Sequence, residues 1–210
     1  MQYICVMIEE NSIDTRSNMF TKTRCAWAQT NELFFSYHDE EWGVPVHDDR
    51  LLFEMLNLEG AQAGLSWLTV LKKRENYRQA FENFEAEKII HYDEAKKADL
   101  LTNEGIIRNR LKIHAVVENA KAFLAVQRES GSFDRYIWQF VDGTPLHHPE
   151  EQQGIARSER MSKDLKKRGF RFVGATICYA FMQAVGMVND HTPDCFRNAE
   201  IMSREVERHL

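Results

Sequence analysis

The stretch DDRLLFEMLNLEG, from Asp48 to Gly60, is the part of the sequence that best predicts the fold. Its leading aspartates favour the N-terminus of a helix, because their carboxylates can accept hydrogen bonds from free backbone N–H groups. The residues that follow repeat at helical spacing. One face then carries Leu52, Phe53, Leu56 and Asn57. The stretch therefore predicts a helix, which Gly60 and Gly64 are expected to break.

Helical spacing continues through most of the remaining chain. Ser66 is a suitable N-cap for a helix over residues 66–81. Further helices are predicted over residues 93–103, 109–129, 132–141, 158–168 and 174–186, with a polar loop at 142–156. The strand-like segment RFVG, at 171–174, is too short to build a sheet. The sequence therefore predicts an all-α fold.

Composition limits the possible classes of protein. The chain has 210 residues, of which 43% are hydrophobic, and a net charge of −5. The length suits one globular unit or two closely packed lobes, and the charge argues against a strongly basic protein that coats nucleic acid. No apolar run approaches the roughly 20 residues of a membrane span, and the N-terminus lacks the basic segment of a signal peptide. Four scattered cysteines are too few for a disulfide framework, so we expect a cytoplasmic protein without membrane contacts.

The first 22 residues differ from the rest of the chain. They show no sustained periodicity, and Met19 offers a second plausible start. We expect residues 1–22 to be a disordered or non-native tail. The main domain is then expected at 23–198, as two closely packed helical lobes, followed by a C-terminal tail at 199–210.

A histidine and a cysteine near the C-terminus suggest a metal site. His191 and Cys195 lie four residues apart in NDHTPDCF, so a helical turn or a tight loop directs both side chains to one point. Two ligands do not complete a tetrahedral zinc site. Cys178 lies in an apolar helix and is expected to be a buried structural thiol, while Cys5 lies in the tail.

Cys25 and His38 are the candidates for the two missing ligands. Cys25 stands in RCAWA, where the ordered part of the chain is expected to begin, and His38 follows in YHDEEWG. With His191 and Cys195 they form a closed Cys2His2 set that joins the two ends of the chain. Four protein ligands leave no open position, so we expect one structural Zn²⁺ per chain rather than a catalytic metal.

Six motifs in order carry a resemblance to a known family. They are RCAWA, YHDEEWGVP, LFEMLNLEGAQAGLSWLTVLKKRENYRQAF, GIIRNRLKI, KKRGFRFVGATICYAFMQAVGMVNDH and the closing Cys195. Over about residues 24–196 the chain resembles the bacterial 3-methyladenine DNA glycosylase I family, and six motifs in register are far more specific than one short pattern. The family begins close to RCAW, so the preceding tail inherits no role.

The resemblance implies a fold, a structural metal and a role in DNA repair. It implies a helix-hairpin-helix DNA glycosylase fold whose termini are joined by a structural zinc, with ligands matching Cys25, His38, His191 and Cys195. It also implies a bacterial, cytoplasmic DNA-repair enzyme that acts on double-stranded DNA containing alkylated bases. We expect it to be a monomer.

The reaction that the resemblance implies is excision of 3-methyladenine by hydrolysis of its N-glycosidic bond, after the nucleotide has left the base stack. Methylation at N3 gives the ring a positive charge, which suits an aromatic cage. The matched motifs supply such rings at Trp27, Tyr37, Trp42 and Trp67. Trp138 lies in an amphipathic helix and is expected to be core. Since no lysine stands out as a Schiff-base nucleophile, we expect an abasic site without strand cleavage.

Glu59 is the candidate catalytic residue. An acid at the end of an apolar helix could simply be solvated, but Gly60 and Gly64 would let the backbone turn tightly and let DNA approach closely. In the family the matching glutamate contacts the flipped base. We therefore expect Glu59 to bind the amine of the base and to complement the charge of the ring, which is electrostatic catalysis.

Contacts with DNA are expected at three places. By analogy with the family, Gly64 and Leu65 fill the gap that the flipped base leaves. The segment GIIRNRLK resembles a hairpin between two helices, where backbone amides can hold a phosphate and Arg108 can add charge. Lys166 begins a second basic patch in KKR at 166–168.

Two alternatives from other classes stay open. A zinc-stapled DNA-binding module would need neither an aromatic cage nor a buried acid, and release of free base from methylated DNA would separate it from a glycosylase. A zinc hydrolase would need an open coordination position, which the Cys2His2 set argues against. The effect of chelation on activity and on folding would distinguish that case.

Overall fold

The computed structural model describes residues 22–148 and 150–208, so the expected N-terminal tail lies, except for Lys22, outside the described residues. The α-helices are α2 (Glu32–Ser36), α3 (Asp49–Gln62), α4 (Trp67–Leu71), α5 (Arg74–Ala80), α6 (Ala86–Ile89), α7 (Glu94–Leu100), α8 (Arg110–Ser130), α9 (Phe133–Trp138), α10 (Glu151–Lys167), α11 (Ala175–Ala184) and α12 (Phe196–Arg208). The short helical segments are the 3-10 turns η1 (Ala26–Thr30), η3 (Glu82–Phe84) and η4 (Gln139–Val141) and the π-helical turn η2 (Tyr37–Glu41). Two strands, β1 (Leu146–His147) and β2 (Val188–Asn189), pair in parallel. Two-residue strands build no layer, so the predicted helical class is confirmed.

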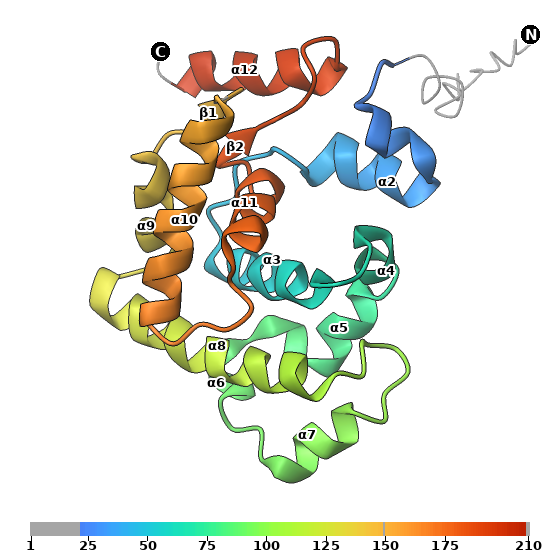
Figure 1. Ribbon diagram of the computed structural model, residues 1–210, viewed down its shortest axis with the longest axis vertical. Coiled ribbons are helices and arrows are strands. Elements are labelled where there is room, and N and C mark those ends of the chain that lie inside the picture. Colours follow the sequence, from blue (N-terminus) through green and yellow to red (C-terminus); the bar gives the residue numbers. More distant parts are fainter. Residues whose placement is uncertain (1–21, 149, 209–210) are drawn as a thin grey trace, which may run out of the picture.

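Helix α3 lies at the centre of the array (Figure 1), where it packs against α8, α9 and α11. Every residue from Leu52 to Ala61 is buried. The helix is therefore covered on all sides rather than on the one face that its spacing predicted. The buried residues of α3 include Glu54 and Glu59. Burial of a carboxyl group is costly, so each of these needs a partner or a function.

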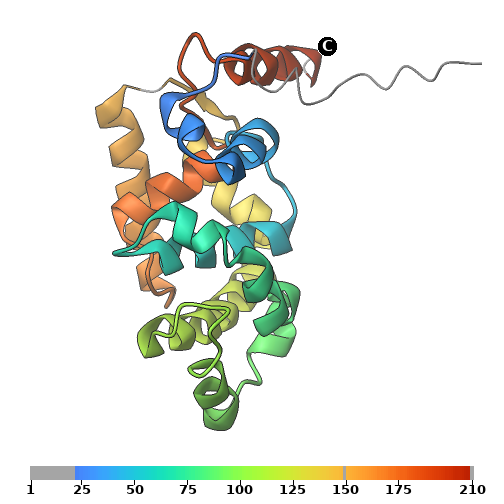
Figure 2. The same cartoon turned by 90° about the vertical axis from the view of Figure 1, so that its right-hand side faces the viewer.

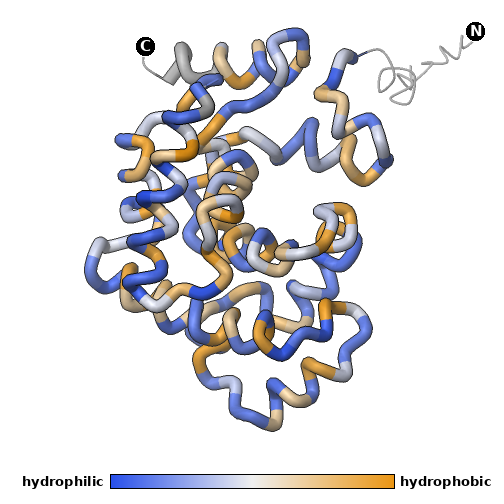
Figure 3. The backbone as a smooth tube through the Cα atoms, viewed as in Figure 1, coloured by the Kyte–Doolittle hydropathy of each residue, from blue (hydrophilic) through white to orange (hydrophobic). Residues whose placement is uncertain are grey.

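The outer helices are more polar than the central ones. Figure 3 shows α11 mainly in the hydrophobic colours and α10 mainly in the hydrophilic ones. Helices α10 and α11 nevertheless pack closely against each other. Within the described ranges, no helix combines the length and the apolarity that crossing a bilayer requires.

Local capping explains where most helices begin. The predicted N-cap Ser66 accepts a hydrogen bond from the backbone N–H of Thr69, as expected. The same arrangement begins four other helices, with caps at Asp48, Asp93, Asn109 and Ser132, and Asn31 caps α2 by accepting from the backbone N–H of Leu33. Each side-chain oxygen satisfies a backbone donor that the first turn leaves free, so these boundaries follow from the local sequence.

Two predictions about α3 and the next helix were wrong in detail. Gly60 does not break α3, which continues to Gln62. Instead it allows a close approach, because an added Cβ would lie 3.1 Å from the Cβ of Phe172. The chain turns at Gly64, whose φ of +77° favours glycine. The single helix expected over 66–81 is divided into α4 and α5 at Lys72 and Lys73.

The polar loop expected at 142–156 is also corrected. It contains β1, and α10 begins within it at Glu151. Gly154, within the stretch expected to be a loop, lies inside α10 against α11. An added Cβ at Gly154 would come within 2.6 Å of the ring of Tyr179, so the missing side chain permits helix packing there.

The two ends of the described chain lie side by side. Phe196 N donates to Thr23 O at 3.0 Å, and Figure 2 shows the segment of η1 and α2 below α12. Helix α12 runs across the boundary expected at residue 198, and its Ile201 is buried. The predicted burial of Trp138 and Cys178 is confirmed.

Candidate functional site

Four buried side chains form a Cys2His2 cluster where the two ends of the described chain meet. Their ligand atoms all lie within 4.8 Å of one another, and the residues are Cys25, His38, His191 and Cys195. Cys195 Sγ lies 3.4 Å from His38 Nε2 and 3.5 Å from His191 Nδ1. Cys25 Sγ lies 3.6 Å from His191 Nδ1. The sequence thus predicted the residues that the fold brings together.

This geometry fits a tetrahedral metal ion. Zinc bonds of about 2.0 Å to nitrogen and about 2.3 Å to sulfur separate neighbouring N and S ligands by roughly 3.5 Å. The donor set of two thiols and two imidazoles suits zinc. An ion held by all four would have a complete tetrahedral set, which opposes the zinc-hydrolase alternative.

The second ring nitrogen of each histidine has a partner. His38 Nδ1 lies 2.8 Å from Asp39 Oδ1, and His191 Nε2 lies 2.9 Å from the carbonyl oxygen of Trp42. A carboxylate and a carbonyl only accept, so these nitrogens carry the protons and His38 Nε2 and His191 Nδ1 face the thiols unprotonated. Such partners orient metal-binding histidines. Arg24 holds Asp39 in turn, with Nη2 at 2.7 Å from Oδ2.

Burial also sets the protonation states of the cluster. It lowers the pKa of His191 to about 4 and lowers the pKa of His38 as well, so both rings are neutral at physiological pH. Neutral imidazole is the form that binds a metal. Burial raises the pKa of the Cys25 thiol, so binding a cation there would release a proton.

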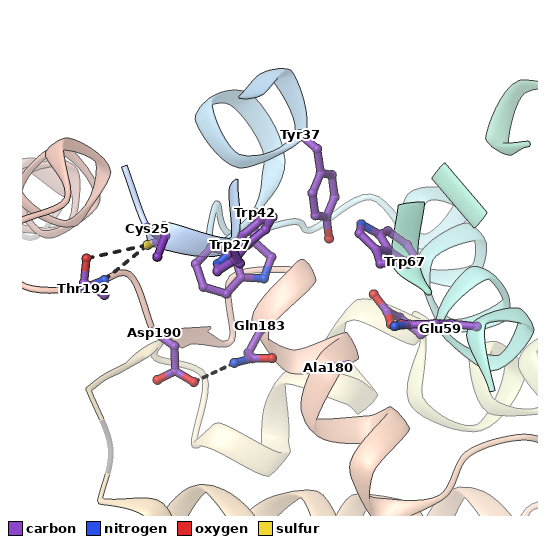
Figure 4. A pocket seen from close by; sticks show the side chains of 12 residues that line it. Cys25, Trp27, Tyr37, Trp42, Glu59, Trp67, Ala180, Gln183, Asp190 and Thr192 are labelled. Carbon is purple, nitrogen blue, oxygen red and sulfur yellow. Dashed lines mark hydrogen bonds between the residues drawn. The ribbon is translucent and has the colours of Figure 1, made fainter. Parts of the chain in front are cut away.

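A cavity of about 460 Å³ lies beside this cluster and shares Cys25 with it. The other side chains that line it are Ala26, Trp27, Tyr37, Trp42, Glu59, Gln62, Trp67, Ala180, Gln183, Asp190 and Thr192. Figure 4 shows the aromatic rings above the cavity, with Glu59 on one side and Asp190 on the other. All five predicted base-binding residues therefore line one cavity, although they come from η1, η2, α3, α4 and the segment after η2.

The aromatic rings form a continuous wall. Trp27 contacts Trp42 edge to face, with centroids 5.0 Å apart, and lies 6.3 Å from Tyr37. Tyr37 lies 5.3 Å from Trp67. The indole Nε1 of Trp67 is buried and has no hydrogen-bond partner in the described part of the chain. A buried donor without a partner on a cavity wall is available to a ligand.

Glu59 is the one acid of the predicted set, and it lies in the last turn of α3. Its side chain is 4% exposed. Burial raises its pKa to about 8, and no described residue hydrogen-bonds its carboxyl group. Glu54 on the same helix differs, since its carboxylate accepts from Arg74 Nε at 2.6 Å and from Arg78 Nη2 at 2.8 Å. Among the described residues, Glu59 is thus a buried acid with no cation paired to its carboxyl group.

Arg74 also links the aromatic wall to α3. Its Nη1 lies 2.6 Å from Glu41 Oε2, and Glu41 belongs to η2, the turn that carries Tyr37 and His38. Arg74 therefore bridges η2, which carries Tyr37, and α3, which carries Glu59. Charged hydrogen bonds of this length are among the stronger ones.

Gly64 and Leu65 lie at the end of α3 beside a second cavity of about 210 Å³, which also has Glu59 on its wall. Leu65 is 42% exposed. Lys112 Nζ holds this end of α3 by donating to Ala61 O at 2.8 Å and to Ala63 O at 2.7 Å. An exposed leucine on an anchored turn is therefore placed near the acid.

The two predicted basic contacts lie elsewhere. Arg108 is exposed before α8 and lies 3.4 Å from Glu104, and Lys166 is exposed in the last turn of α10. Neither lines the cavities of Glu59. In the basic patch at 166–168, Arg168 is paired with Glu129 and Asp164.

Sequence reasoning missed the polar residues opposite Glu59. Asp190 stands directly before the predicted ligand His191, and Gln183 lies seven residues earlier on α11. Both line the cavity. The quoted motif contained them, but only the tertiary structure, which places α11 and the segment after β2 around this cavity, shows which way they face.

Comparisons with known proteins agree with this geometry. The sequence profile of the methyladenine glycosylase family matches residues 27–198. The chain is 48% identical over 181 residues to DNA-3-methyladenine glycosylase 1 of Escherichia coli strain K12, covering 82% of this chain and 95% of the relative. It is 47% identical over 178 residues to DNA-3-methyladenine glycosylase of Haemophilus influenzae, covering 82% and 96%.

Solved structures show the same likeness. A crystal structure of 3-methyladenine DNA glycosylase I superposes with a TM-score of 0.79 at 51% identity, covering 83% of this chain and 98% of that one. The Staphylococcus aureus structure that addresses recognition of 3-methyladenine gives 0.78 at 36% identity, covering 83% and 96%. The profile and the relatives span most of the chain, and this protein therefore belongs to the methyladenine glycosylase family of enzymes.

Proposed function

We propose that this protein is a DNA-repair glycosylase that excises 3-methyladenine from alkylated double-stranded DNA. It would hydrolyse the N-glycosidic bond and leave an abasic site without cutting the strand. The observation that carries the proposal is Glu59, a buried acid that no residue in the described ranges neutralises and that faces a cavity walled by aromatic rings. Membership of the family supports it, as does a similar structure described as a complex with 3-methyladenine.

The depth of the site supports base flipping. Trp42, Tyr37 and Glu59 are buried, and a base stacked in a duplex cannot reach them. The target nucleotide must leave the stack, and a damaged, weakly paired base does so at the least cost. Gly64 and Leu65 would occupy the space it leaves, since their turn is exposed beside the Glu59 cavity.

The charge of the methylated base suits the cavity. An N3-methylated adenine in DNA carries positive charge, and aromatic faces attract a cation by about 1–2 kcal/mol at a desolvated site. Burial raises the pKa of Glu59 to about 8, so Glu59 is largely protonated in the empty cavity. A cationic ring beside it would favour the carboxylate. Glu59 would then accept the hydrogen bond of the base's amine.

Glu59 would act mainly through electrostatics. A cationic base is already a good leaving group, so the carboxylate needs only to favour the charge distribution of the transition state. Among the remaining proposed contacts, Arg108 and Lys166 would bind backbone phosphates, which position the protein without reading sequence. We also propose, from the membership of the methyladenine glycosylase family, that the fold is that of the helix-hairpin-helix glycosylases.

The Cys2His2 cluster would hold one structural zinc ion through Cys25, His38, His191 and Cys195. Such an ion would stabilise the junction of the two chain ends. Its influence on the cavity would pass through protein contacts, because the ring of His191 hydrogen-bonds the backbone of Trp42 and packs 4.5 Å from its indole. We further propose that the protein acts as a monomer in the bacterial cytoplasm, and that its main domain begins near residue 23 and includes α12.

The decisive experiment is incubation with methylated duplex DNA, followed by chromatography of the released bases. Native protein is expected to release 3-methyladenine, and Glu59→Gln to release it much more slowly at unchanged fold. Gel analysis before and after alkaline treatment would show whether strands break only at abasic sites. DNA binding without base release would instead support the zinc-stapled binding module.

A further inference from the structure

The wall opposite Glu59 contains a polar pair to which the proposed mechanism gives no role. Gln183 on α11 and Asp190, directly after β2, both line the cavity. Gln183 Nε2 donates to Asp190 Oδ2 at 2.8 Å, and the hydroxyl of Tyr179 donates to the same oxygen at 2.7 Å. Figure 4 shows the amide nitrogen of Gln183 toward Asp190 and its oxygen on the side toward Glu59.

The orientation of this amide is determined by its partner. A glutamine amide can present either its oxygen or its nitrogen by turning over. At Gln183 that turn would bring the amide oxygen against a carboxylate oxygen, which also only accepts. The backbone is anchored as well, because Gly43 N donates to Gln183 O at 3.0 Å. The cavity therefore meets a carbonyl acceptor of fixed direction.

We propose that Gln183 is a specificity-determining residue and that Asp190 is its positioning residue. Gln183 Oε1 accepts a hydrogen bond, or a polarised C–H contact, from the edge of the bound base that lies away from Glu59. The inference rests on the proposed function, whose substrate it narrows to electron-poor purines that carry no acceptor on the edge away from Glu59. An acceptor on that edge would meet an acceptor in a buried site, which is costly. Asp190 also adds negative charge to a cavity proposed to bind a cation.

Binding of free 3-methyladenine tests this assignment, with the fluorescence of the cavity tryptophans as the signal. Gln183→Met keeps the length of the side chain and removes the acceptor. Asp190→Asn keeps the shape of its partner but lets the amide turn over. We expect affinity to fall about five- to tenfold in the first variant and by a similar or smaller factor in the second. Melting temperature and metal content should stay near native values.

A double-mutant cycle separates positioning from simple packing. If Asp190 acts through Gln183, the double variant binds no more weakly than Gln183→Met alone. Gln79→Met is the matched control, because Gln79 is an exposed amide paired with the carboxylate of Glu75 at 3.3 Å. It should bind 3-methyladenine with native affinity.

The possible outcomes separate the roles assigned to Gln183 and Asp190 from the proposed function. Native affinity in both single variants would overturn the role of Gln183, and fully multiplicative losses would overturn the positioning role of Asp190. If native protein excises 3-methyladenine while the variants bind it normally, only this inference fails. If native protein neither binds nor excises the base, the proposed function fails with it.

Discussion

Replacing Glu59 by glutamine should stabilise the empty protein increasingly as the pH rises. Burial raises the pKa of Glu59 to about 8, whereas glutamate in an unfolded chain titrates near about 4.3. Between these values the folded state keeps a proton that the unfolded state releases, so the free energy of unfolding falls as the pH rises. The stabilisation by protonated Glu59 is complete below about pH 4 and is lost as the pH passes through about 8.

The size of the effect follows from linkage. The slope is about 1.4 kcal/mol per pH unit, which gives about 2.7 kcal/mol between roughly pH 5.5 and 7.5. Glutamine does not titrate and escapes this loss. For a protein of this size the melting temperature of Glu59→Gln, relative to native, should therefore rise by roughly 5–11 °C over that interval.

Thermal melts of native protein and Glu59→Gln across this pH range, without DNA or free base, measure the difference. Glu118→Gln is the control, because Glu118 is an exposed acid on α8 paired with Lys121 at 2.8 Å. Its difference from native should change little with pH. A difference between native and Glu59→Gln that is equally flat would show that Glu59 is ionised normally, and the electrostatic reasoning about the cavity would be refuted.

Four further outcomes are expected. Purified protein should carry about one zinc per chain, and Cys195→Ser should lose metal and melting temperature together; metal-free protein with an unchanged variant would contradict the cluster. A chain that begins at Met19 should keep its activity and nearly all its stability, because every matched motif follows that residue; a large loss would show that the first 18 residues matter. Leu65→Ala should slow excision from duplex DNA while free 3-methyladenine still binds. Equal losses in both assays would show that Leu65 does not fill the space left by the flipped base. Release of 7-methylguanine should be slow, because its O6 acceptor would face the Glu59 carboxylate, and efficient release would contradict that contact.

Local chemistry was sufficient to predict much of this protein. Side chains such as Ser66 and Asn109 begin helices in the structure because a cap needs only the next few residues. The Cys2His2 set was predictable because cysteine is scarce and zinc demands four ligands of defined type. The aromatic residues and Glu59 were predictable as a group from the motifs that carry them.

Tertiary structure alone decided how these parts act. Glu59 becomes an acid of raised pKa because α3 is covered on all sides, and helical spacing, which reports neighbours three or four residues apart, predicted one buried face. Gly60 was expected to break α3 and Gly154 fell in an expected loop, yet contacts with the Cβ of Phe172 and the ring of Tyr179 make both of them packing positions. The amide of Gln183 is fixed because α11 lies beside Asp190, in the segment after β2. It faces Glu59 because both side chains line one cavity. The contact of Gly60 with Phe172 and the cavity shared by Glu59 and Gln183 join segments more than 100 residues apart, and their energy depends on the complete packed core rather than on any local pattern.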